Sequence, residues 1–247
     1  MANNEGGENQ RALFAPGFRP QKFLSMTPTP PVERDLVQAC KHLLEVEALK
    51  VVDCGNDGSD QLGWLYRLTP LGYHLSRLPM DAKVGKLLIV GCLLGCLENA
   101  LTIAAALSCP KSCFLFGGQS IRIDPAHLEA RDLLIENGFG GKDWPGGTVK
   151  GDLIAVVAAY RAWEAKKNAE KGNFCRNHAL NGTSLREMDT LRRQFSDLMV
   201  DAGLVSPRLE RDNNAPDSDD CNLANEDAML TSCYLVAGLY LNICTLI

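Results

Sequence analysis

Several of the short motifs that mark a nucleotide or metal site are missing from this sequence of 247 residues. No P-loop of the form Gly-x-x-x-x-Gly-Lys-Ser/Thr occurs, so the chain lacks the amide cradle, lysine and hydroxyl that bind nucleotide phosphates and Mg²⁺. No Cys-x-x-Cys pair occurs either, and the four histidines are scattered along the chain. The sequence by itself therefore offers no recognisable nucleotide or metal centre.

Long hydrophobic runs are also missing. The longest, from Leu87 to Leu97, is too short to span a bilayer and is followed by Glu98. The N-terminal segment MANNEGGENQ has no apolar stretch of the kind that a signal peptide needs. We therefore expect no membrane association and a cytoplasmic or nuclear location.

Positive charge is in the minority. The chain has 25 Lys and Arg against 30 Asp and Glu, which gives a formal net charge of -5 at pH 7. A dedicated nucleic-acid module is usually basic, so any nucleic-acid role here must rest on a local basic patch or on a part of the protein that is missing from this sequence. The 46% of hydrophobic residues is enough to build a folded core, which argues against wholesale disorder.

Among the residues that often bind metals or undergo redox chemistry, cysteine is abundant, with ten in the chain. Cys92 and Cys96 are four residues apart, as are Cys109 and Cys113, and the first pair lies within an apolar stretch. Thiols stay reduced inside cells, so we expect reduced core cysteines. The alternative is that some of them bind a metal.

Hydrophobic periodicity and turn residues predict a mainly α-helical chain. In the first part we expect a helix from Val32 to Ala48, strands at Leu49–Asp53 and Trp64–Leu68, and a short helix at Pro70–Leu78. Further helices are expected at Ala82–Leu97, Asn99–Ser108, Pro125–Asn137, Leu153–Lys171, from Leu185 to Gly203, and Asn225–Gly238. Leu94, in the most apolar of these helices, is an expected core residue.

Several helix starts carry capping signals. Asp81, Asp124 and Asp152 each precede an expected helix, where a carboxylate accepts hydrogen bonds from unpaired backbone amides. Ser184 and Glu187 form a capping box at the start of the helix from Leu185. The glycine-rich stretch 138–151 has the wrong spacing for a P-loop, and we interpret it as a surface loop.

The stretch from Leu68 to Leu107 carries a more specific pattern, L-T-x-L-G-x-x-L-x-x-L-P-x-D-x-x-x-G-K-L-L followed by C-L-x-x-A-L-T-I-A-A-x-L. It resembles the helicase-associated region of DEAH/RHA-type RNA helicases, a winged helix followed by a ratchet (HA2) bundle. Similar matches are Phe23-Leu24 with Pro30-Pro31, the run DLIAVVAAYRAW, and AGLYLN near the C-terminus. The resemblance implies a mainly α fold, with a partial winged helix, its β-hairpin and a helical ratchet bundle.

The resemblance also implies a division of the chain. Residues 1–22 are expected to form a disordered tail and residues 23–78 a partial winged helix. Residues 79–204 correspond to the helical ratchet bundle. Residues 205–247 correspond to an acidic linker, a last helix and the truncated start of an OB-like domain.

In such helicases the ratchet bundle lies against single-stranded RNA beside the motor domains. The resemblance therefore implies an accessory C-terminal region that grips RNA, with motor domains as its partners. ATP and Mg²⁺ belong to those motor domains, so we expect no cofactor in this chain and no ATP hydrolysis by it alone. Grip by charge would use basic side chains on the bundle. These are Arg161, Arg176, Arg186, Arg192 and Arg193, with Lys166 and Lys167 nearby in sequence.

Other interpretations remain open at this point. The basic residues could instead lie on a solvated face, paired with Glu164, Asp189 and Asp197. Tyr160 and Trp163 are either core residues or a platform for bases. The whole chain is alternatively a non-catalytic module whose acidic surface binds a protein, or a degenerate helicase fragment. An RNA affinity that falls steeply with salt would favour the RNA-holding function over the protein-binding one.

Overall fold

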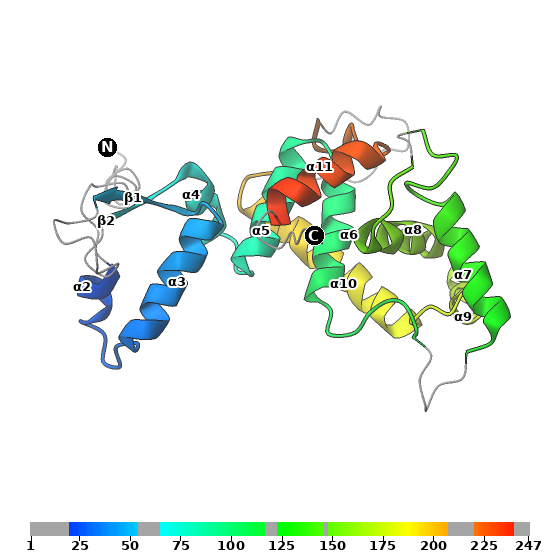
Figure 1. Cartoon of the computed structure of the whole chain (residues 1–247), viewed down its shortest axis with the longest axis horizontal. Coiled ribbons are helices and arrows are strands. Elements are labelled where there is room, and N and C mark those ends of the chain that lie inside the picture. Colours follow the sequence, from blue (N-terminus) through cyan, green and yellow to red (C-terminus); the bar gives the residue numbers. More distant parts are fainter. Residues whose placement is uncertain (1–19, 54–64, 117–122, 146–147, 207–219, 240–247) are drawn as a thin grey trace, which may run out of the picture. The chain divides into compact units, whose positions relative to one another are not determined.

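The computed structural model describes residues 20–53, 65–116, 123–145, 148–206 and 220–239 (Figure 1). By contacts between Cα atoms the chain forms two compact units, one up to Lys86 and one from Leu87 onward. The expected N-terminal tail and acidic linker lie almost wholly outside the described residues, as does AGLYLN from Tyr240 on. The four-part division of the chain stays a prediction.

The first unit is a helix packed on a hairpin. Its elements are α2 (Pro20–Leu24), α3 (Glu33–Glu45), β1 (Leu49–Asp53), β2 (Leu65–Leu68) and α4 (Pro70–Ser76). The two strands are antiparallel, with Leu49 opposite Leu68. Leu36 and Cys40 of α3 bury themselves against Tyr66 of β2. The expected strand pair is therefore confirmed for its described residues. The face of the hairpin that carries Tyr66 packs against α3.

The family-like pattern at the start of α4 has a local explanation. The Thr69 hydroxyl accepts a hydrogen bond from the Gly72 backbone N–H at 2.9 Å, which caps the helix. A Cβ atom on Gly72 would lie 2.0 Å from the backbone oxygen of Ala48. Only glycine allows this close approach, so the threonine and the glycine of the pattern are structural residues.

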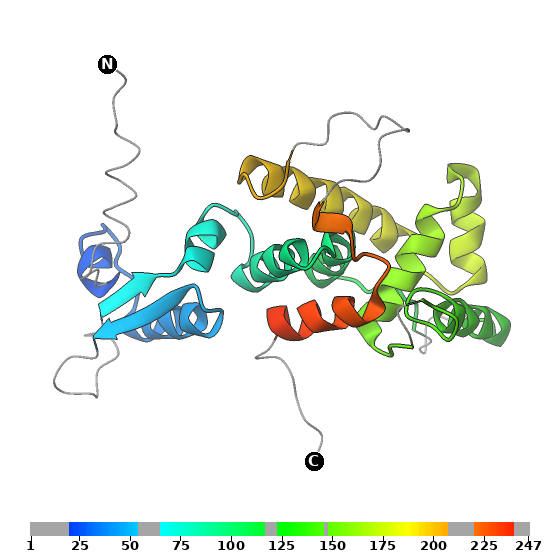
Figure 2. The same cartoon turned by 90° about the horizontal axis from the view of Figure 1, so that it is seen from above.

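The second unit is a helical bundle (Figures 1 and 2). Its main helix, α6 (Leu97–Ser108), packs on α10 (Gly182–Asp201) and α8 (Asp152–Glu164). Except for Glu98, every residue of α6 from Leu97 to Ala105 is buried. The other elements are α5 (Ala82–Leu93), α7 (Pro125–Asn137), α9 (Asn168–Asn177), η2 (Asp220–Asn222) and α11 (Ala228–Leu239). The expected mainly α fold class is confirmed.

The most apolar helix ends earlier than the sequence predicted, and Leu94 is not a core residue. Gly95 adopts a positive φ of 71°, which breaks the chain into α5 and α6, and the Cys96 backbone N–H bonds back to Gly91. The Leu94 side chain lies on this turn and is 38% exposed. The core positions of α5 are Leu87 and Leu88, both fully buried.

Two other helices also differ from prediction, one in its continuity and one in its start. The expected helix Leu153–Lys171 is divided into α8 and α9 by a turn that brings Cys175 back toward Trp163. Helix α10 begins earlier than expected, because the Asn181 side chain accepts hydrogen bonds from the Thr183 and Ser184 amides. Ser184 therefore lies buried inside the helix and is not its cap.

The remaining capping predictions have mixed outcomes. Asp81 accepts from Lys83 N at 2.9 Å and Asp124 from Ala126 N at 3.0 Å, so both caps are confirmed. The N-cap of α8 is Gly151, and Asp152 is the first helical residue. Helix α10 ends at Asp201 with Ala202 as its C-cap, and the predicted stop residue Gly203 follows with a positive φ.

Candidate nucleic-acid interface

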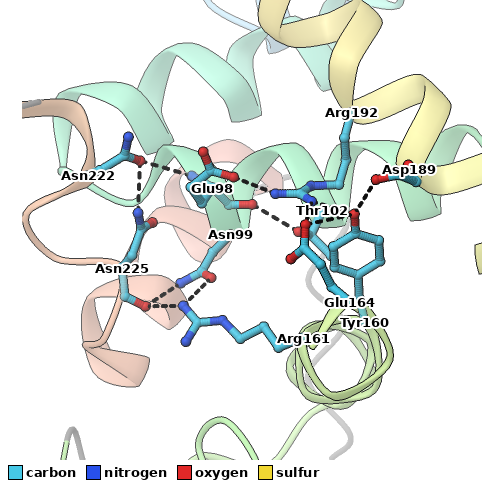
Figure 3. A network of polar contacts seen from close by, with 10 residues as sticks. All are labelled: Glu98, Asn99, Thr102, Tyr160, Arg161, Glu164, Asp189, Arg192, Asn222 and Asn225. Carbon is cyan, nitrogen blue, oxygen red and sulfur yellow. Dashed lines mark hydrogen bonds and ion pairs between the residues drawn. The ribbon is translucent and has the colours of Figure 1, made fainter. Parts of the chain in front are cut away.

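A polar network joins α6, α8, α10 and the segment before α11 (Figure 3). Arg192 of α10 stands at one end, and only 11% of its side chain is exposed. Its guanidinium donates to the carboxylate of Glu98 on α6, to the Tyr160 hydroxyl at 2.5 Å and to Glu164 at 3.4 Å. The positive charge of Arg192 is therefore largely used within the bundle.

Tyr160 lies between these charges and is fully buried. Its hydroxyl donates to the Asp189 carboxylate at 2.8 Å, and the Arg192 guanidinium lies 4.4 Å from its ring centroid. Burial raises the pKa of the Tyr160 hydroxyl above its ordinary range. Trp163, one turn further along α8, is also buried. In this structure both aromatic side chains are core residues, with no face open to a base.

Arg161 occupies the other side of the network (Figure 3). It donates to Asn99 Oδ1 at 3.0 Å, to the backbone oxygen of Asn225 at 2.7 Å and to Glu226 at 3.0 Å. Its guanidinium also lies 4.5 Å from the ring centroid of Phe139. Arg161 thus fastens α8 to α6 and to the residues that precede α11.

The other three predicted arginines lie at the surface. Arg176 bonds Asn173 of its own helix, α9. Arg193 is 77% exposed and pairs with Asp189, one of the acidic partners considered from the sequence, at 2.7 Å. Arg186 is exposed, and its backbone oxygen accepts from the Thr190 hydroxyl at 3.1 Å, while among the described residues no hydrogen bond or ion pair involves its side chain. The structure therefore divides the five arginines into two engaged ones and three accessible ones.

Lys171 of α9 is a partly exposed cation that lies near Arg186. Lys171 and Arg186 both act electrostatically on the Cys175 thiol, so α9 and α10 bring their charges to the same place. Lys171 Nζ also lies 3.9 Å from the ring centroid of Trp163. Lys171 lies four residues before Cys175, and this helical spacing could have indicated from the sequence that the two share one face of α9. We call Lys171, Arg176, Arg186 and Arg193 the α9–α10 basic surface.

Cys175 has the environment of a core thiol. It is 6% exposed, and burial raises its pKa although Arg186 and Lys171 act to lower it. A nucleophilic cysteine needs the opposite shift, toward the thiolate. The structure therefore gives no support to a catalytic role for Cys175.

The glycine-rich stretch folds back on the end of α7 in its described part. In the glycine-rich stretch a Cβ on Gly141 would lie 2.0 Å from the Glu136 backbone oxygen, and Lys142 pairs with the Glu136 carboxylate. The described part of this loop thus packs closely on its own chain, and the absence of a nucleotide site stays a prediction. Over the described ranges no group of three or more His, Cys, Asp or Glu could hold a metal ion. The same ranges contain no helix that is long and apolar enough to cross a membrane.

Comparisons with known proteins point to one kind of domain. Residues 81–199 match the family described as helicase associated domain (HA2), ratchet-like. The chain is 35% identical over 191 residues to the putative ATP-dependent RNA helicase DHX57 of Mus musculus, covering 72% of this chain and 13% of that protein. It is 31% identical over 222 residues to the ATP-dependent DNA/RNA helicase DHX36 of Rattus norvegicus, covering 88% of this chain and 19% of that protein.

A plant relative gives the same result. The DExH-box ATP-dependent RNA helicase DExH1 of Arabidopsis thaliana is 33% identical over 199 residues, which cover 80% of this chain and 17% of that protein. The chain therefore spans about a fifth or less of the length of these relatives.

Proposed function

Since residues 81–199 belong to the helicase-associated (HA2), ratchet-like family, we propose that this chain is an accessory region of a DEAH/DExH-type RNA helicase that holds single-stranded RNA. Its relatives are named ATP-dependent helicases. In the proposal, helicase motor domains hydrolyse the ATP. The part played by this chain is the grip on the strand. Its partners are single-stranded RNA and helicase motor domains.

One observation carries the proposal. Arg186 and Arg193 are exposed and seven residues apart on α10, so they lie on one face of that helix. The buried residues Met188 and Phe195 hold the opposite side of α10 in the bundle. A rigid helix thus presents two guanidinium groups outward, with Arg176 and Lys171 on the neighbouring helix α9. Such a surface holds phosphates by charge and does not read bases.

The existing ion pair on this surface is no obstacle to RNA. Arg193 and Asp189 form an exposed pair one turn apart, and such pairs contribute only about 0.3–0.5 kcal/mol. A phosphate can therefore replace the carboxylate at small cost. Arg161 and Arg192 differ, because their side chains are largely buried, at 27% and 11% exposure, and each is bonded to several groups of the bundle. We accordingly place the phosphate contacts at the α9–α10 basic surface and remove Arg161 and Arg192 from it.

The experiment compares Arg186→Ala/Arg193→Ala with wild type in titrations of a labelled unstructured RNA at several salt concentrations. Each phosphate contact on a single strand contributes about 0.7 to the slope of log affinity against log salt, so the double variant should lose roughly 1.4. The loss should be similar for RNAs of unrelated sequence. Circular dichroism should show an unchanged fold.

A matched control removes two exposed arginines elsewhere. Arg34 and Arg77 are exposed residues of the first unit, and Arg34→Ala/Arg77→Ala changes the net charge by the same amount. This control should keep the wild-type slope. If both double variants lost the same amount of salt slope, the effect would come from net charge and not from this surface. Unchanged affinity in Arg186→Ala/Arg193→Ala would exclude this surface and favour a protein-binding role.

A further inference from the structure

Two thiols that are far apart in the sequence meet in the second unit. Cys92 of α5 and Cys221 of η2 are 129 residues apart, and their Sγ atoms lie 2.9 Å from each other. A disulfide bond is about 2.05 Å long, so the two sulfurs need to approach by less than about 1 Å to form one. Both side chains are half-buried, which leaves them open to a small oxidant.

The backbone around the two thiols holds them in place. The Ala224 N–H donates to the Gly95 backbone oxygen at 2.8 Å, and the Glu98 N–H donates to the Asn222 side chain at 3.3 Å. These bonds dock the residues after Cys221 onto the turn between α5 and α6. The short Sγ–Sγ distance therefore belongs to a fixed contact between two segments.

The neighbouring cysteine is a poor competitor for Cys92. Cys96 follows it by four residues but is fully buried, and its thiol is directed to the backbone oxygen of Ala224 at 3.4 Å. Burial also raises the pKa of the Cys96 thiol, which lowers its reactivity. The geometry thus favours Cys221 over Cys96 as the partner of Cys92.

We propose that Cys92 and Cys221 are a site of reversible oxidation, and that their disulfide locks the segment of η2 and α11 onto α5. With hydrogen peroxide, one thiol loses its proton and the thiolate attacks a peroxide oxygen to become a sulfenic acid, while the hydroxide that leaves takes up that proton as the first water. The second thiol attacks the sulfenic sulfur, the S–S bond forms and a second water leaves. Two electrons pass from the thiols to the peroxide, and a small thiol such as glutathione reverses the step by exchange.

The disulfide should stabilise the bundle because it closes a long loop. Cross-linking residues this far apart removes much conformational freedom from the unfolded chain. For a protein of this size the melting temperature should rise by on the order of 10 °C on oxidation. Helix α11 already contacts α5, since a Cβ on Gly238 would lie 2.8 Å from the Leu87 side chain. The covalent link adds to this packing and does not replace it.

The test uses the whole 247-residue protein, treated with a small excess of hydrogen peroxide and digested without reduction. Mass spectrometry should find a linked peptide pair that contains Cys92 and Cys221, and dithiothreitol should abolish it. The increase in melting temperature should appear and disappear with that peptide pair. Cys92→Ser and Cys221→Ser should each lose both signals while circular dichroism keeps the same helix content.

A matched control is Cys233→Ser, which removes an exposed thiol on α11 outside the pair. This variant should behave as wild type in both measurements. A peptide pair linking Cys92 to Cys96, or oxidation that yields only sulfinic acid or intermolecular links through Cys233, would overturn the proposal. So would an equal rise in melting temperature in Cys92→Ser.

Discussion

Cys113 shows how burial alone gives one residue a pH response. Its side chain is 3% exposed, and burial raises the pKa of its thiol from 9.0 to about 12. Above about pH 9 the thiol of the unfolded chain loses its proton, while the folded protein keeps it. The unfolded state then binds fewer protons, so the free energy of unfolding falls as pH rises from about 9 to about 12.

We predict that Cys113→Ala loses less stability than wild type between pH 8 and pH 10. The difference should be roughly 1 kcal/mol, because one proton is released over about one pH unit of that interval. Urea unfolding of both proteins at the two pH values measures it. Cys233→Ala is the control, since that side chain is exposed, and it should keep the wild-type difference. Equal pH responses in all three proteins would contradict the prediction.

Leu94 illustrates how little residue type says about burial at one position. Hydrophobicity placed it in the core, yet the left-handed Gly95 turns the chain there and leaves the side chain 38% exposed. Leu87, in the same apolar run, is fully buried against α11. The difference between the two leucines comes from their places in the bundle, since Leu87 packs on α11 and Leu94 lies at the turn that follows α5.

At the scale of helices, the arginines of α10 have opposite roles. Arg192 connects α10 to Glu98 of α6 and Tyr160 of α8 with most of its side chain buried, whereas Arg193 points into solvent. Neighbouring positions on a helix face about 100° apart, so one residue can lie at the interface and the next at the surface. A deletion of charge should therefore have different effects at these two positions.

We predict that Arg192→Ala lowers the free energy of unfolding by about 2–4 kcal/mol, because it leaves a partly buried carboxylate without its main cation. The matched variant Arg193→Ala should cost less than about 0.5 kcal/mol, as expected for an exposed pair. Denaturant unfolding followed by circular dichroism checks both values. Similar small losses in the two variants would show that the network does not hold the bundle.

The same pair of variants bears on the proposed RNA contact. Loss of RNA binding in Arg192→Ala would come with loss of fold, so it would say nothing about phosphate contacts. Loss in Arg193→Ala would come from the surface itself. Element packing thus decides which arginine is a useful probe.

At the scale of the whole molecule, the sequence of neither compact unit contains a P-loop. We predict that the purified chain does not hydrolyse ATP, even with RNA and Mg²⁺ present. The physical reason is the missing phosphate cradle, since the sequence has no P-loop and Lys142 is paired with Glu136. Phosphate release measured against a heat-denatured sample tests this. ATP hydrolysis that is stimulated by RNA and lost on mutation of a residue in this chain would contradict it.

The sequence by itself determined the features that depend on near neighbours. Asp81 and Asp124 cap their helices through amides two residues away, and Gly203 ends α10 within one turn. The spaced pattern from Leu68 to Leu107 also sufficed to identify the helicase-associated family, later confirmed over residues 81–199. Caps and strand periods act over a few residues, and the family pattern is visible in the order of the residues themselves, so both can be recognised before any contact is known.

Only the tertiary structure decided which polar groups form hydrogen bonds and ion pairs inside the bundle. Arg192 binds Glu98, which is 94 residues away, and Arg161 binds Glu226, which is 65 residues away. Cys92 meets Cys221 rather than Cys96, although Cys96 is its neighbour in sequence. These partners come together only because α6, α8, α10 and η2 pack against one another, and no local preference of the chain encodes such a distance.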